Sequence, residues 1–132
     1  MKQDYFGRDA RFHHIGIAVK SVIDICPDCL ITHDPIQGVN VAFMVMNGCP
    51  LELIEPVRED SPVSACLRKG TKLLHVCYEV DDIEIAVRKS RYYGFHVIGD
   101  PAPASAFEQR RIAFVSSDAF GVVELLEREK QV

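Results

Sequence analysis

The feature of this sequence that most constrains its fold is an internal repeat. Three segments of the first half match three segments of the second half in the same order. The matched pairs are HIGIAV (14–19) with HVCYEV (75–80), VAF (41–43) with IAF (112–114), and LELIE (51–55) with VELLE (123–127). A chain that contains the same pattern twice is expected to fold as two copies of one module.

The pattern of each copy indicates mostly strands. Short apolar runs predict strands at 12–19, 39–46, 51–55, 73–80, 95–98, 111–115 and 122–126. Asn47-Gly48 predicts a hairpin turn. Ser61-Pro62 predicts the start of a helix over about 61–69, and Asp81-Asp82 the start of a second that ends at Gly94. The stretch 21–38 is less regular: it predicts a short helix or turn before Pro27, and at most one short edge strand.

The two copies differ in length. From His14 to Glu52 the spacing is 52 − 14 = 38 residues, whereas from His75 to Glu124 it is 124 − 75 = 49 residues. The eleven missing residues fall where the second copy has its helix and the strand after it. We therefore expect the first module to have lost this helix and edge strand. The expected domain is 1–132, with module one at about 11–57, the linker helix at about 61–70 and module two at about 72–128.

Composition limits the classes of partner. A net charge of −4, with both signs spread along 132 residues, gives no basic surface for nucleic acid or for an anionic membrane. No run approaches the ~20 apolar residues that cross a bilayer, and the first residues do not resemble a signal peptide. A cytoplasmic protein with a small-molecule substrate is expected.

The five cysteines are an odd number in a chain without an export signal, so reduced thiols are expected rather than a disulfide framework. Cys26-Pro27-Asp28-Cys29 is a CxxC motif, which invites a redox or a zinc interpretation. No second CxxC completes a four-cysteine zinc site. The motif is therefore interpreted as incidental.

Histidine and glutamate recur at matching positions of the two modules. Two copies that pack about a pseudo-two-fold axis would bring His14, Glu52, His75 and Glu124 together. Two imidazoles and two carboxylates suit a divalent transition metal, with positions left for water or substrate. Any one of these residues alone would be read as an ordinary core or surface residue, but their recurrence favours a metal site. His13 competes with His14, and the register against His75 selects His14.

The duplicated module resembles the vicinal oxygen chelate superfamily, and within it the methylmalonyl-CoA epimerases. The resemblance rests on HIGIAV and LELIEP in the first copy and on LLHVCYEVDDIEIAV and GVVELLE in the second. It implies an α+β fold in which two tandem βαβββ modules form a curved mixed sheet around a central metal-binding cup, the first module being truncated. It also implies that His14, Glu52, His75 and Glu124 are the metal ligands.

The implied reaction is proton abstraction next to a carbonyl, by a metal-dependent epimerase or isomerase acting on an acyl thioester such as methylmalonyl-CoA. Glu124 and Glu52 are the candidate catalytic residues, and the metal would be cobalt, manganese, nickel, zinc or iron. Two alternatives use the same fold: a glyoxalase-type lyase, and a non-catalytic small-molecule binding or resistance protein. A fourth protein ligand at Glu52 disfavours an extradiol dioxygenase.

Two departures from the epimerase pattern concern the substrate pocket. Ser116-Ser117-Asp118 stands where the relatives usually have His-Pro-Lys, and the segment 104–109 replaces a glycine-rich loop. The shortened first module would also leave part of the sheet uncovered. We therefore expect a non-standard pocket and a homodimer that covers this face.

Overall fold

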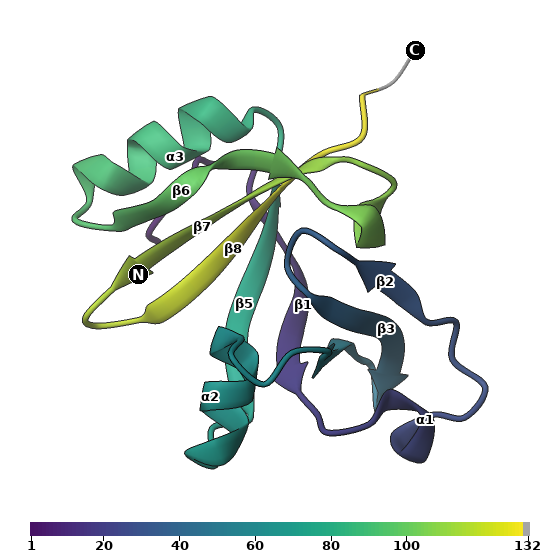
Figure 1. Ribbon diagram of the computed structural model, residues 1–132. Coiled ribbons are helices and arrows are strands. Elements are labelled where there is room, and N and C mark those ends of the chain that lie inside the picture. The colour runs from purple at the N-terminus through teal and green to yellow at the C-terminus, as the bar shows by residue number, and fades with distance from the viewer. Residues whose placement is uncertain (131–132) are drawn as a thin grey trace. The chain divides into compact units, whose positions relative to one another are not determined.

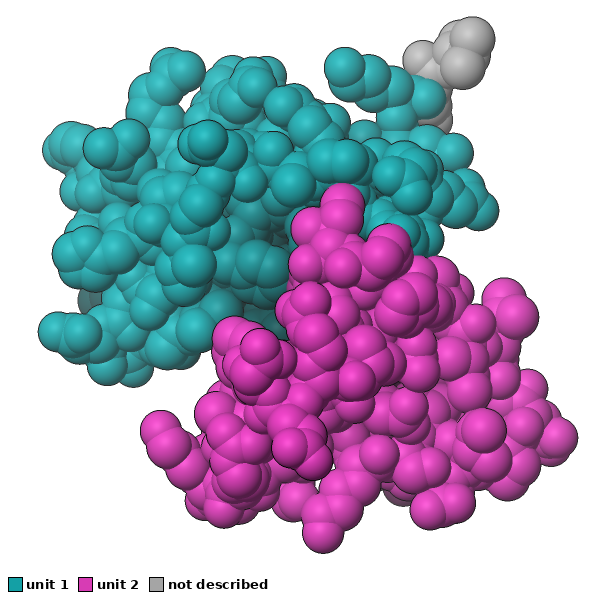
Figure 2. Space-filling model, in the orientation of Figure 1, with its two compact units in different colours: residues 1–13, 75–132 teal, residues 14–74 magenta. Residues whose placement is uncertain are grey.

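The computed structural model describes residues 1–130 (Figure 1). The chain divides into two compact units: unit 1 consists of residues 1–13 and 75–132, and unit 2 of residues 14–74 (Figure 2). No helix among the described residues is long and apolar enough to cross a membrane.

Unit 2 contains the first module and the helix that follows it. Its elements are β1 (Arg11–Ala18, which enters from unit 1), α1 (Val22–Ile25), β2 (Thr32–Asp34), β3 (Val39–Met46), β4 (Cys49–Pro56) and α2 (Pro62–Arg68). The strands lie in the order β2-β3-β4-β1. The first and last strands, β1 and β4, run parallel, whereas β2, β3 and β4 are joined antiparallel.

Unit 1 contains the second module and the N-terminal residues. Its elements are β5 (Leu73–Val80, which enters from unit 2), α3 (Ile83–Tyr92), β6 (His96–Pro103), the 3-10 turn η1 (Ser105–Phe107), β7 (Arg111–Ser117) and β8 (Gly121–Glu127). The strands lie in the order β5-β8-β7-β6. Strands β5 and β8 run parallel, whereas β6, β7 and β8 are joined antiparallel. Helix α3 packs against β6, β7 and β8.

Both units therefore have the same strand–helix–three-strand topology, and the predicted α+β fold with two tandem βαβββ modules is confirmed. The first module is shortened as expected: the stretch 21–38 keeps only a remnant of the helix and of the edge strand, in agreement with the short helix or turn and the short edge strand predicted there. Helix α1 has 4 residues against 10 in α3, and β2 has 3 residues against 8 in β6. The remnant helix is held at its start, where the Val22 amide donates a 2.8 Å hydrogen bond to Glu55 Oε1.

Local sequence signals explain where the longer elements begin and turn. Asp82 caps α3 by accepting hydrogen bonds from two backbone amides of the first turn. Ser61 caps α2 in the same way, ahead of Pro62 at the first helical position. Asn47 and Gly48 both have positive φ (47° and 84°), as a type I′ hairpin turn requires.

Strand β6 is longer than predicted. It was expected to end at Ile98, but it continues to Pro103 with a register shift between Ile98 and Ala102. Gly99 lies in this bulge with φ at +76°. Glycine and proline in this stretch are residues typical of a turn, so the sequence predicted the end of the strand there. The strand continues because β6 pairs with β7 on both sides of the bulge.

The prediction of reduced thiols is wrong for two of the five cysteines, because Cys26 and Cys29 form a disulfide. Cys26 is the residue directly after α1, and a turn then brings the Cys29 amide nitrogen to 3.1 Å from the Cys26 carbonyl oxygen. This turn sets the two Cα atoms 5.4 Å apart, within the span that a disulfide bridges. The three other cysteines are not disulfide-bonded.

Ion pairs at the surface of unit 1 predict acid sensitivity. Burial raises the pKa of Glu79, but hydrogen bonds from Arg110 and Arg128 outweigh burial, so this pKa lies below its ordinary 4.5. A hydrogen bond from Arg111 likewise lowers the pKa of Glu127. A lowered carboxylate pKa stabilises the fold above the unfolded-state pKa, and this stabilisation is lost as pH falls through the folded-state pKa.

We therefore expect the thermal unfolding midpoint to fall as pH is lowered from about 6 to about 3. The loss should be modest, because partly exposed pairs contribute about 0.2 to 1 kcal/mol each. The double substitution Glu79→Gln and Glu127→Gln should flatten this dependence when unfolding is followed by circular dichroism. An equally steep loss in the variant would show that these pairs do not cause the acid sensitivity.

Candidate metal centre

Unit 2 contains a buried histidine–glutamate pair. His14 lies on β1 and Glu52 on the adjacent parallel strand β4, where Gly16 is the register partner of Glu52. The two residues are 0% and 4% exposed, and His14 Nε2 lies 3.3 Å from Glu52 Oε1. His13, the competing histidine, is only half-buried and has its ring against Phe107. The predicted choice of His14 agrees with this burial.

Unit 1 contains the equivalent pair in the same arrangement. His75 lies on β5 and Glu124 on the parallel strand β8, with Cys77 as the register partner of Glu124. The two residues are 9% and 2% exposed, and His75 Nε2 lies 3.1 Å from Glu124 Oε1. In both units the glutamate pairs with the residue two positions after the histidine. The duplication seen in the sequence therefore extends to the register and the contact distance.

An aromatic ring packs on each histidine, also at repeated positions. The Phe43 ring lies against the His14 ring with centroids 5.8 Å apart, and the Phe114 ring lies against the His75 ring at 5.7 Å, both edge-to-face. The sequence comparison had aligned these two phenylalanines without giving Phe43 a role. Their register partners on the neighbouring strands are Glu52 and Glu124. In each pair the phenylalanine ring therefore restricts rotation of the imidazole ring.

The atoms of each pair suit a metal ion. A buried carboxylate must be paired or coordinated, and each glutamate here has an imidazole nitrogen within 3.3 Å. Two ligands that bind one ion at about 2.1 Å in neighbouring positions lie about 3 Å apart. The two measured distances are close to this value. Imidazole nitrogen and carboxylate oxygen are also the donors that divalent transition metals accept.

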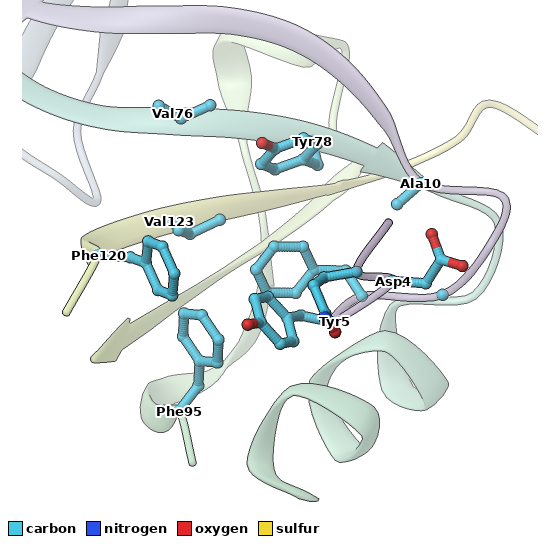
Figure 3. A pocket seen from close by; sticks show the side chains of 11 residues that line it. Asp4, Tyr5, Ala10, Val76, Tyr78, Phe95, Phe120 and Val123 are labelled. Atoms are coloured by element: carbon cyan, nitrogen blue, oxygen red, sulfur yellow. The ribbon is translucent and has the colours of Figure 1, made fainter. Parts of the chain in front are cut away.

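Unit 1 also contains a cavity, whose lining side chains are drawn in Figure 3. It has a volume of about 320 Å³, and Val76 and Tyr78 line it from β5, where they alternate with His75 and Cys77. Aromatic rings of Tyr5, Phe6, Phe95 and Phe120 complete much of the lining. Because neighbouring strand residues point to opposite faces, this cavity and the histidine–glutamate pair belong to different surfaces.

Two arginines and two further histidines of the described chain do not belong to either pair. Arg110 contacts Glu79, and Arg111 contacts Glu84 and Glu127, so both arginines hold carboxylates of their own chain. His33 and His96 are exposed.

The chain belongs to the glyoxalase/bleomycin resistance protein/dioxygenase superfamily, whose family model matches residues 13–114. The match includes His14, Glu52 and His75 and ends before Glu124. Within the superfamily the resemblance to methylmalonyl-CoA epimerases is confirmed by the relatives described next.

The mitochondrial methylmalonyl-CoA epimerase of Bos taurus is 32% identical over 96 residues, which are 71% of this chain and 55% of the relative. The chain thus spans about half the length of this curated relative. The ethylmalonyl-CoA/methylmalonyl-CoA epimerase of Cereibacter sphaeroides is 31% identical over 96 residues, covering 70% of this chain and 72% of the relative.

Solved structures agree on the fold. A hypothetical protein from Bacillus halodurans has a TM-score of 0.77 at 27% identity, covering 95% of this chain and 99% of that one. A variant of Streptomyces coelicolor methylmalonyl-CoA epimerase, in complex with 2-nitronate-propionyl-CoA, has a TM-score of 0.70 at 26% identity. This similarity covers 91% of this chain and 98% of the Streptomyces chain.

Proposed function

We propose that this protein is a metal-dependent epimerase that removes a proton next to the carbonyl of an acyl thioester, of which methylmalonyl-CoA is the first candidate. The observation that carries the proposal is the duplicated, buried histidine–glutamate pair at equal register in both modules. The names of the relatives supply the reaction and the acyl-CoA class of substrate. The complex with 2-nitronate-propionyl-CoA supports the same class.

In this proposal His14, Glu52, His75 and Glu124 bind one divalent cation, two ligands from each module. These residues would hold the cation, which would supply positive charge next to the oxygen of the thioester carbonyl, where negative charge develops. The edge-to-face rings Phe43 and Phe114 keep the two imidazoles in the orientation that ligation requires. The identity of the metal is left to elemental analysis.

Glu124 and Glu52 are the proposed proton carriers. A carboxylate has two oxygens, so one can serve as a ligand while the other accepts a proton from the carbon next to the carbonyl. Epimerisation needs a base on one side of that carbon and an acid on the other. In the proposal one of these two carboxylates, each contributed by one copy of the module, removes the proton and the other returns one.

The test is exchange of the proton next to the carbonyl in heavy water. Methylmalonyl-CoA incubated with the metal-reconstituted protein should incorporate deuterium at this carbon, measured by mass spectrometry and proton NMR. The same protein treated with chelator is the control and should show only background exchange. Lack of exchange with methylmalonyl-CoA, ethylmalonyl-CoA and propionyl-CoA in the presence of each candidate metal would exclude the proposed reaction.

A second candidate is a small-molecule binding protein that has kept the fold without catalysis. The observation that favours it is the reduction of α1 and β2 to four and three residues, which removes material from module one. Calorimetric binding of an acyl-CoA without deuterium exchange would support this candidate over the epimerase.

A further inference from the structure

The Cys26–Cys29 disulfide lies where module one departs most from module two. In module two, α3 covers one face of its sheet and buries Ile83, Ala86 and Ser90. In module one, α1 buries only Val22, and Cys26 and Cys29 follow at once. Both cysteines pack against the cluster that Val22 forms with three other buried residues, Val19, Ala42 and Leu53. The disulfide turn therefore occupies part of the surface that a full helix covers in the other module.

Two features make this disulfide open to reaction. Both cysteines are half-buried rather than enclosed, so a small thiol can approach. The bond also closes a loop of only four residues, and short loops restrict the unfolded chain least. This disulfide is partly exposed and gains little stabilisation from chain entropy. Disulfides of this kind are reduced more easily than buried structural disulfides.

The surroundings of the two sulfur atoms are unequal. Cys29 Sγ lies 3.7 Å from the backbone carbonyl oxygen of Phe43 on β3. A disulfide sulfur has no proton to donate, but a thiol at this place can donate its proton to that oxygen. This interaction favours the protonated thiol over the thiolate at Cys29. Because the leaving group departs as a thiolate, Cys26 is the better leaving group.

We propose that Cys26 and Cys29 form a thiol–disulfide exchange site for low-molecular-weight thiols and disulfides of the glutathione class. In reduction, a thiolate of the small thiol attacks Cys29 Sγ, the bond between the two cysteines breaks, and its electron pair goes to Cys26 Sγ, which takes up a proton. A second small thiolate then attacks the sulfur of the bound small thiol and forms the small-molecule disulfide, and Cys29 leaves and takes up a proton. Oxidation is the reverse: two protein thiols and one small disulfide give the protein disulfide and two small thiols.

The first test is a titration of the wild-type protein in buffers of reduced and oxidised glutathione. After acid quenching and alkylation, mass spectrometry should find five thiols at the reducing end and three at the oxidising end, with a reversible transition confined to Cys26 and Cys29. Circular dichroism checks that the protein stays folded throughout. A protein that keeps five thiols, or three, over the whole series would overturn the proposal.

The second test separates the two sulfurs. The variant Cys29→Ser should accumulate a glutathione mixed disulfide at Cys26 when treated with oxidised glutathione. The variant Cys26→Ser, which lacks the same bond, should accumulate at least about fivefold less at Cys29. The variant Cys66→Ser, which replaces a half-buried cysteine outside the disulfide, should behave as wild type. Equal adducts at Cys26 and Cys29 would overturn the assigned difference between the two sulfurs, in which Cys26 forms a thiolate more readily than Cys29.

Discussion

The substitution His75→Ala is expected to abolish stoichiometric metal binding. The imidazole is 9% exposed and lies 3.1 Å from Glu124, so its removal takes away one proposed ligand and leaves a buried carboxylate without its imidazole neighbour. Loss of a neighbour that only orients a ligand costs about 10- to 100-fold in metal affinity, and loss of a ligand should cost more. Elemental analysis after reconstitution and dialysis measures the result.

The control for this prediction is His96→Ala. His96 belongs to the same unit but is exposed on β6, so its replacement should leave metal content unchanged. The substitution His14→Ala in the other module should repeat the loss seen for His75→Ala, because the proposal requires both modules to supply ligands. Full metal content in either His75→Ala or His14→Ala would refute the four-residue site.

The substitution Ile83→Ala is expected to destabilise the fold by about 2 to 5 kcal/mol. Ile83 is 0% exposed and anchors the first turn of α3 in the core of unit 1, where it packs with Val80, Ala113, Val115 and Leu125. Removal of three carbon atoms leaves a cavity that the surrounding strands fill only in part. Urea unfolding followed by circular dichroism measures the change.

The matched control is Ile85→Ala, two residues further along the same helix. Ile85 is 54% exposed, and its truncation should change stability by less than about 0.5 kcal/mol. The comparison keeps residue type and helix constant and changes only burial. Alanine has the higher helix propensity, so propensity cannot cause a loss in either variant. Similar losses for the two variants would therefore show that burial of Ile83 does not determine the effect.

Much of the fold follows from local pattern. Capping residues and the Asn47-Gly48 turn act within a few residues of the chain, so α2, α3 and the first hairpin were predictable. The internal repeat predicted more of the fold than any local signal did, because it indicated the same topology for both modules without knowledge of the strand pairing. It also selected the four candidate ligands, which no single segment would have identified. Whether these four residues bind one ion stays a prediction.

The errors in prediction lie where distant segments decide the structure. The extension of β6 to Pro103 depends on pairing with β7 on both sides of a bulge. The sequence did not predict this extension, because Gly99 within the bulge is a residue typical of turns. The sequence left open whether 21–26 forms a helix or a turn, because the helix α1 depends on a contact from Glu55 on β4 to the amide of Val22.

The sequence by itself determined the duplication, the fold class and the candidate ligand types, because these depend on periodicity and on residue chemistry. Only the tertiary structure decided that each histidine lies 3.1 to 3.3 Å from its glutamate, and that a phenylalanine ring packs on each one. It also decided that Cys26 and Cys29 are joined, through a turn that leaves both half-buried. Such distances depend on strand register and packing between residues far apart in the chain, which a pattern along the chain does not contain.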